Sequence, residues 1–263
     1  METQPKPDEK PKATGWKRNL AIRFDRFVLR MSRKWLVWLT TLVIIYVGLP
    51  FLAPVFMEYD MPIPARVIYG IYDRLCHQLV FRSWFLFGEQ AYYPRERAGL
   101  PVGSFEDYAS RDPFFRNVDV YTLDYNLIIA GGRFVGNEEM GWKVAYCQRD
   151  VAIYGAIALF GIVYGLLRRA GVNVLPLPIL VYVLVGIVPV GLDGGIQLLA
   201  NPPYNGFGLA WYPLWESTPL FRTLTGGLFG LCSAWLALPY LAESMDELAR
   251  EVSRKFERAG IEP

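Results

Sequence analysis

The sequence predicts an all-α integral membrane protein with four membrane-spanning helices, cytoplasmic N- and C-termini, and an extracytoplasmic insertion with room for a small β-hairpin. Two observations support this fold class. Of the 263 residues, 53% are hydrophobic and 15% are aromatic, which is more than a soluble domain usually carries. Charged residues are dense at the two ends of the chain and absent from long stretches between them. The distribution of charge, and not the formal net charge of +2, therefore indicates a membrane protein.

The N-terminal part of the chain is predicted to be cytoplasmic. Residues 1–15 are rich in Pro, Lys and Glu and lack the apolar core of a secretory signal peptide, so we expect a disordered tail. Residues 16–34 alternate basic and apolar side chains at helical spacing. We interpret this segment as a basic amphipathic helix on an anionic membrane surface, with packing on a soluble partner as the alternative. Its apolar face comprises Trp16, Leu20, Phe24, Phe27, Val28 and Met31.

Four uncharged segments are long enough to cross the hydrocarbon core of a bilayer, which is roughly 30 Å thick. They lie in a predicted membrane domain of residues 35–242 and cover residues 35–57, 151–167, 172–192 and 224–241. Pro50 and Pro54 are expected to kink or end the first of them, because proline lacks the N–H that a helix interior needs.

The basic residues predict the orientation, because cytoplasmic loops of membrane proteins carry an excess of Lys and Arg. Ten Lys or Arg residues precede the first predicted span, and Arg168 and Arg169 follow the second. Arg250, Arg254 and Lys255 follow the fourth. All three placements agree with a multi-pass protein of the inner (cytoplasmic) cell membrane whose two termini are cytoplasmic.

Two further segments are predicted outside the bilayer. Residues 243–263 have the apolar spacing of a cytoplasmic amphipathic helix, which needs either lipid or another protein to cover its apolar face. Residues 91–145 form an outer insertion. Within it, residues 118–129 have strand-like composition, and Gly131-Gly132 is a plausible turn into residues 133–135, which predicts a hairpin.

Unusual polar residues gather at the predicted outer ends of the spanning helices. They define a candidate outer polar site made of Cys76, His77, Gln78, Arg82, Cys147, Arg149, Asp150, Asp193, Gln197, Glu216 and Arg222. No single motif among them forces this convergence, which follows from the predicted topology.

Four ordered motifs carry a family resemblance: CHQxxxRSWFxxGEQ from Cys76, YCQRDVAIYG from Tyr146, DGGIQ from Asp193, and ESTPLFRTLTGGLFG from Glu216. With them the chain resembles the bacterial and archaeal membrane-protein family named domain of unknown function 2085. The resemblance implies a small helical membrane protein and supplies no activity. The chain departs from the family pattern in two respects. Asp150 stands where a second cysteine is usual, and residues 91–145 separate motifs that are normally close.

Asp193 and Gln197 are four residues apart and therefore share one face of a helix. A carboxylate near the membrane boundary is costly unless it is paired or hydrated, and Arg149 and Arg222 are the natural partners. One interpretation is a site for a lipid headgroup, a quinone or an ion. The other, which we favour, is a structural salt-bridge network that locks the helix ends.

His77 is the single histidine of the chain. Adjacent Cys and His side chains on a helix diverge by about 100°, so both rarely bind one ion, and we predict no metal site. Cys76 and Cys147 both fall on the predicted outer side, where disulfides persist. A disulfide between them, a pair of free buried thiols and shared ligation of an ion remain open alternatives.

The sequence favours a non-catalytic accessory or structural subunit of a larger membrane protein assembly, because it lacks a complete catalytic set and has amphipathic ends. The alternative is a membrane enzyme that acts on a lipid or quinone headgroup, with Asp193 as acid or base and Arg149 and Arg222 as anion anchors. A small transporter is the least favoured hypothesis. We predict no cofactor beyond a bound lipid or quinone. The expected partners are the lipid bilayer and other membrane subunits, and no nucleic acid.

Overall fold

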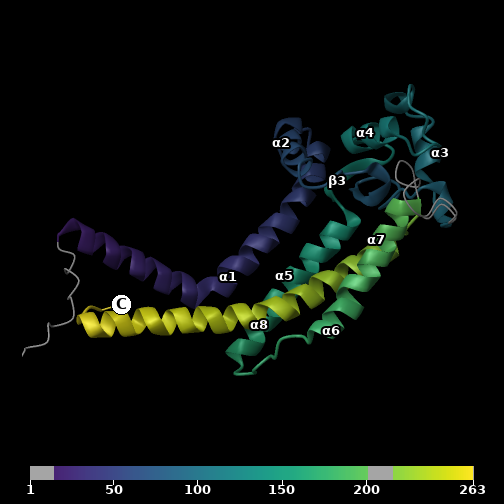
Figure 1. Ribbon diagram of the computed structural model, residues 1–263. Coiled ribbons are helices and arrows are strands. Elements are labelled where there is room, and N and C mark those ends of the chain that lie inside the picture. The colour runs from purple at the N-terminus through teal and green to yellow at the C-terminus, as the bar shows by residue number, and fades with distance from the viewer. Residues whose placement is uncertain (1–14, 201–215, 263) are drawn as a thin grey trace, which may run out of the picture. The chain divides into compact units, whose positions relative to one another are not determined.

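Figure 1 shows the computed structural model, which describes residues 15–200 and 216–262. The chain divides into two compact units. The terminal unit combines the N-terminal residues up to Trp38 with the C-terminal residues from Leu241, and the membrane unit contains Leu39–Tyr240. Residues 1–14 of the predicted disordered tail lie outside the described part of the chain.

Within the described residues, four helical stretches are long and apolar enough to cross a membrane, as the sequence predicts. They are α1 (Trp16–Glu58), α5 (Gln148–Arg169), Ile179–Leu199, and α8 (Pro219–Ala259). The third stretch consists of α6 (Ile179–Val181), a π-helical segment (Tyr182–Ile187) and α7 (Val188–Ala200).

Several predicted boundaries are wrong. The third spanning helix begins at Ile179 and not at residue 172, because Pro176 and Pro178 remove backbone donors and disfavour helical geometry in the residues before them. The amphipathic segments predicted as separate helices, 16–34 and 243–263, are continuous with α1 and α8. Pro50 and Pro54 lie inside α1, which runs on to Glu58.

In the terminal unit, the first part of α1 packs against the last part of α8. Leu29, Val252 and Phe256 form its small buried core. Lys255 Nζ lies 2.5 Å from Asp25 Oδ2, and Arg33 Nη2 donates to Ser253 Oγ over 3.3 Å. The apolar face of the C-terminal amphipathic segment is therefore covered by α1 of the same chain. The predicted apolar face of α1 stays largely uncovered instead, with exposed side chains at Trp16, Leu20, Phe24, Phe27 and Met31.

An extramembrane domain of residues 62–147 lies between the first two spanning helices of the membrane unit. It begins with α2 (Pro62–Tyr72) and contains an antiparallel three-stranded sheet in the order β1-β3-β2. The strands are β1 (Ser83–Leu86), β2 (Gly136–Asn137) and β3 (Gly141–Cys147). Ser83 pairs with Cys147 and Phe85 pairs with Lys143. Figure 1 shows α2, β3 and the short helices α3 (Phe105–Ala109) and α4 (Tyr125–Arg133) gathered at one end of the spanning helices.

The predicted hairpin is wrong in its position. Residues 125–133 form α4, because the Asp124 side chain accepts a hydrogen bond from the Leu127 backbone N–H over 2.7 Å and so caps the helix. The hairpin in the described chain instead joins β2 to β3, with Asn137 paired with Gly141.

The predicted insertion does not have a core of its own. Phe81 and Phe85, which precede residue 91, are buried in one cluster with Phe105, Leu127 and Met140. A second cluster joins the domain to the spanning helices through a group of tyrosines, Tyr46 of α1, Tyr72 of α2, Tyr146 of β3 and Tyr154 of α5. The Tyr46 and Tyr146 hydroxyl oxygens lie 2.8 Å apart. Because these contacts join all four elements, they fix the start of α5, which directly follows β3, beside α1.

Glycines allow α8 to approach α5 closely. A Cβ atom at Gly230 would lie 2.1 Å from the Ile153 carbonyl oxygen, and one at Gly226 would lie 2.7 Å from the Arg149 carbonyl oxygen. Only glycine fits at such distances, because the backbone atoms it meets cannot rotate away. This contact brings the start of α8 beside the start of α5, where the polar residues lie.

Candidate functional site

Arg222, in the first turn of α8, is the most deeply buried charged side chain of the polar site, with 2% of its surface exposed. Its guanidinium forms an ion pair with Glu216. It also donates to the Phe81 carbonyl oxygen over 3.2 Å and to Gln148 Oε1 over 3.4 Å. Arg222 therefore joins α8 to the extramembrane domain and to the first residue of α5.

Glu216 also contacts two further side chains, those of Gln197 and Arg82. Its Oε1 accepts a hydrogen bond from Gln197 Nε2 of α7 over 2.7 Å and lies 3.9 Å from Arg82 Nε. Gln148 extends the network, since its Nε2 donates to the Ser83 carbonyl oxygen over 3.0 Å. Burying an ion pair costs desolvation energy, which is offset only where the remaining polar atoms also find partners. Here Glu216 has such partners from three parts of the chain.

Arg149 and Asp193 form a second ion pair between α5 and α7, with Nη2 and Oδ2 2.5 Å apart. Thr225 Oγ1 of α8 donates to the same carboxylate oxygen over 3.3 Å. Gly194 makes room for the pair, because a Cβ there would lie 2.9 Å from Arg149 Nη1. Two buried atoms, Asp193 Oδ1 and Arg149 Nε, have no hydrogen-bond partner among the described residues. Of the two arginines predicted as partners of Asp193, the contact is made by Arg149.

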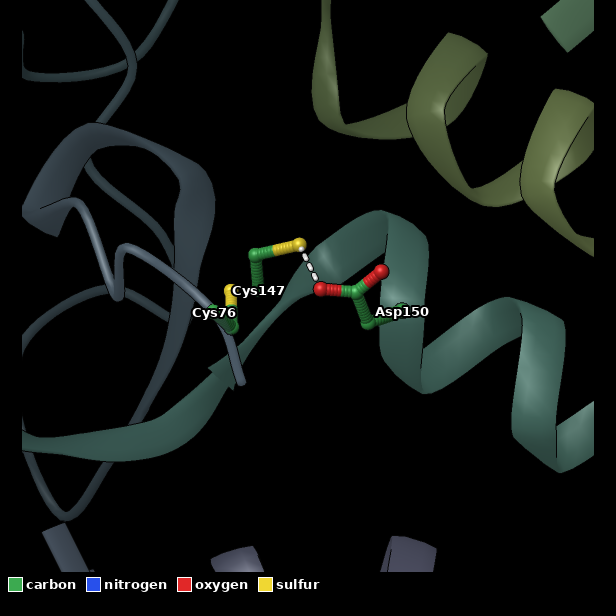
Figure 2. A group of neighbouring side chains, drawn as sticks. All are labelled: Cys76, Cys147 and Asp150. Carbon is green, nitrogen blue, oxygen red and sulfur yellow. Dashed lines mark hydrogen bonds between the residues drawn. The ribbon is translucent and has the colours of Figure 1, made fainter. Parts of the chain in front are cut away.

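Cys76, Cys147 and Asp150 form a separate cluster, shown in Figure 2. One sulfur or oxygen atom from each lies within 4.8 Å of the others. Cys147 Sγ donates to Asp150 Oδ2 over 2.9 Å, and both cysteines are free thiols. The disulfide between them, one of the three alternatives that the sequence leaves open, is not formed in this structure. The hydrogen-bonding Cys76 thiol, burial and the nearby Asp150 carboxylate together raise the pKa of Cys147 well above its ordinary value.

The two residues that follow Cys76 do not join this cluster. His77 is exposed, and it is not among the side chains that converge with the two thiols. Gln78 is buried in a left-handed backbone conformation with φ of 45°. Its Nε2 donates to the Tyr69 carbonyl oxygen over 2.9 Å, which is a structural role within the extramembrane domain.

Sequence reasoning missed Lys143, a fully buried lysine of β3. Its Nζ donates to the carbonyl oxygens of Gln78, Gly131 and Gly132 over 2.6, 3.3 and 2.8 Å. Burial lowers the pKa of Lys143 to about 7, opposed by the charges of Cys76 and Asp73. A single lysine within the apolar alternation of residues 141–147 was the available signal.

The polar residues therefore form two arrangements. One is a network that joins the ends of three spanning helices to the extramembrane domain. It also includes Gln148, Ser83 and Thr225, which lie within the sequence motifs quoted above. The other is a thiol and carboxylate cluster where β3 continues into α5. Asp150, a predicted member of the outer polar site that stands where the family pattern has a second cysteine, lies beside both thiols.

Comparison with known proteins supports the family resemblance over part of the chain. Residues 139–236 match the family model described as predicted membrane protein, DUF2085. The matched range contains the motifs that begin at Tyr146, Asp193 and Glu216, while the Cys76 motif lies outside it. No curated protein and no solved structure shows a significant match.

Proposed function

We propose that this chain, a multi-pass membrane protein whose residues 139–236 belong to the DUF2085 family, is a non-catalytic accessory or structural subunit of a larger membrane protein assembly. The observation that carries the proposal is the closed network around Arg222. A substrate site needs polar atoms that a ligand can reach. Arg222 is 2% exposed, and its guanidinium is already engaged by Glu216, Phe81 and Gln148.

The terminal unit supports the same proposal. The first part of α1 leaves a row of large apolar side chains uncovered, including Trp16 at 70% and Phe24 at 62% exposure. A contiguous apolar surface of this kind is typical of contact with another protein or with lipid. In the proposed orientation both termini are cytoplasmic, and the extramembrane domain faces the opposite side of the inner cell membrane. The row would then contact a partner subunit near the cytoplasmic surface.

A second candidate function, an enzyme that acts on a lipid or quinone headgroup, rests on a different observation. Asp193 Oδ1 and Arg149 Nε are buried without hydrogen-bond partners among the described residues. The Arg149 side chain is 23% exposed, so it is the more accessible of the two paired arginines. In this alternative Asp193 would be the acid or base and Arg149 would bind the anionic group, whereas Arg222 is not available for that role.

The deciding experiment is purification of the tagged full chain from its native membrane in a mild detergent, followed by mass spectrometry of proteins and lipids. We expect a stoichiometric set of other membrane proteins. A chain that purifies alone, and above all one that carries a bound lipid or quinone, would contradict the assembly and favour the enzyme.

Two variants sharpen this test. Phe24→Glu places a charge in the uncovered apolar row, and Asn19→Glu places the same charge at an exposed polar position of the same helix. The proposal predicts loss of the co-purifying proteins with Phe24→Glu and their retention with Asn19→Glu. Equal recovery with both variants would show that the row is not the contact surface.

A further inference from the structure

We propose that Cys76, Cys147 and Asp150 form a binding site for a zinc ion. The sequence predicts no metal site, although it leaves shared ligation of an ion by Cys76 and Cys147 open. The structure supplies a ligand set, in which two sulfur atoms and one carboxylate oxygen lie within 4.8 Å of one another. This inference goes beyond the proposed function and does not depend on it.

The backbone positions two of the three ligands firmly. Cys147 is the last residue of β3 and the N-cap of α5, and Asp150 is the third residue of that helix. Side chains at the N-cap and three positions later both lie beside the first helical turn, so they can reach one another. Their sulfur and oxygen atoms are accordingly 2.9 Å apart. Because β3 is hydrogen-bonded to β1 and α5 packs closely against α8, this pair is held on a rigid frame.

The third ligand, Cys76, comes from a distant part of the sequence. Cys76 follows α2, and its backbone N–H donates to the Tyr72 carbonyl oxygen over 2.9 Å, which closes the turn after the helix. Tyr72 itself is anchored, since its hydroxyl donates to the Tyr46 carbonyl oxygen over 2.5 Å. Figure 2 shows the Cys76 sulfur beside that of Cys147, although the two residues come from different elements.

The donor types select the ion. Two thiolates with one carboxylate suit zinc, which binds sulfur at about 2.3 Å and carboxylate oxygen at about 2.0–2.2 Å in tetrahedral geometry. In that geometry the ligand atoms would be roughly 3.6–3.8 Å apart. Starting from atoms within 4.8 Å of one another, side-chain adjustments are enough to reach it. Three protein ligands leave one tetrahedral position open for water or for another small ligand.

The charge balance is consistent with a dication. Binding would release the two thiol protons. One zinc ion with two thiolates and one carboxylate then has a net charge of −1. When it is protonated, Lys143 adds a compensating positive charge, because it interacts electrostatically with Cys76. Zinc would also join the turn after α2 to the start of α5, which adds a bond between the extramembrane domain and a spanning helix.

The test uses the full chain in native membranes, probed with a maleimide that alkylates free thiols. The proposal predicts that Cys76 and Cys147 resist alkylation and become reactive after a zinc chelator is added, without a reductant. It also predicts about one zinc ion per purified chain. Protection that only a reductant removes would show a disulfide and overturn the proposal. Full reactivity without either reagent, with no zinc regained on titration with Zn²⁺, would overturn it as well.

Three variants make the result specific. Cys76→Ser and Asp150→Asn should each lower the zinc content at least tenfold, while Cys232→Ser, which removes a buried thiol in the middle of α8, should leave it unchanged. Replacement of zinc by Co²⁺ should give a thiolate-to-metal absorption band in the parent protein and in Cys232→Ser, but not in Cys76→Ser. The band in the parent protein and in Cys232→Ser would show that a thiolate binds the metal directly. Equal zinc content in all four proteins would exclude these ligands.

Discussion

Arg222, in the first turn of α8, donates a hydrogen bond over 3.2 Å to the backbone carbonyl oxygen of Phe81, which is 1% exposed in the core of the extramembrane domain. The two residues are 141 positions apart in sequence. Together with the Arg222–Glu216 ion pair, this bond couples the position of a spanning helix to a domain outside the bilayer. The membrane helices and the extramembrane domain should therefore lose their structure together when the network is broken.

Arg222→Met should be strongly destabilising. It leaves the Glu216 carboxylate buried without its guanidinium partner, a change that costs about 3–5 kcal/mol in buried ion pairs. Thermal unfolding of the purified protein in detergent would measure the loss. The double variant Arg222→Met/Glu216→Leu should recover most of the stability, because it removes both charges. An unchanged melting temperature in the single variant would contradict a structural role for the pair.

Gly230→Ala should disrupt the contact between α8 and α5. The added methyl group would lie 2.1 Å from the Ile153 carbonyl oxygen, so the two helices must move apart at a cost of about 1–3 kcal/mol or more. Gly227→Ala is the matched control, because its methyl group meets no atom within 4 Å and alanine favours helix over glycine by up to about 1 kcal/mol. Thermal unfolding should therefore shift in opposite directions for the two variants. A similar shift in both would show that the backbones are not in close contact there.

Hydropathy predicted the spanning helices well because a bilayer leaves the chain few alternatives: a long uncharged segment must satisfy its backbone hydrogen bonds internally. The ends of the helices, which depend on individual proline and capping residues, were harder to predict. The apolar run continues through residues 172–178, and only the paired prolines Pro176 and Pro178 exclude the helix there. In residues 118–129 the β-branched and aromatic content favoured a strand in the prediction. In the structure Asp124 instead caps a helix that begins at Tyr125.

Several residues of the polar network could be predicted from the sequence, but their contacts could not. Asp193 had two plausible arginine partners, and the choice of Arg149 depends on how α5, α7 and α8 are rotated about their axes. No spacing along the chain encodes that rotation. Asp150 and Cys147 are visibly three residues apart, but the arrival of Cys76 beside them depends on the path of the chain through α2 and the sheet.

Lys143 should make folding stability depend on pH. Its pKa is about 7 in the folded chain, against an ordinary value of 10.5. Between these values the unfolded chain binds a proton that the folded chain has released, so this residue's contribution to stability rises with pH, by at most about 1.4 kcal/mol per pH unit. Below pH 7 both states bind the proton, and the contribution is constant and unfavourable.

The pH effect is measured as the difference between the parent protein and Lys143→Met, because the contributions of all other ionisable groups that the two proteins share cancel in that difference. Thermal unfolding from pH 6 to pH 9 should show the stability of the parent protein gaining on that of the variant above about pH 7. A constant difference over this interval would mean that Lys143 stays charged, held by its three carbonyl acceptors.

Phe256→Ala should loosen the terminal unit without unfolding the membrane unit. Phe256 is 3% exposed in a core that it shares with Leu29 and Val252, and removal of a buried phenyl ring costs about 3–5 kcal/mol in a well-packed core. Because this core is small, the loss should free the last part of α8 locally. Hydrogen exchange in residues 241–262 should therefore become faster, while exchange in α5 stays unchanged.

Lys255→Ala is the control for that variant. Its side chain is 66% exposed, and although Nζ lies 2.5 Å from Asp25 Oδ2, exposed ion pairs contribute only about 0–1 kcal/mol. Exchange in residues 241–262 should then differ little from that of the parent protein. If Lys255→Ala accelerated exchange as much as Phe256→Ala, the ion pair and not the apolar core would hold the two helices together, and salt should accelerate exchange in the parent protein as well.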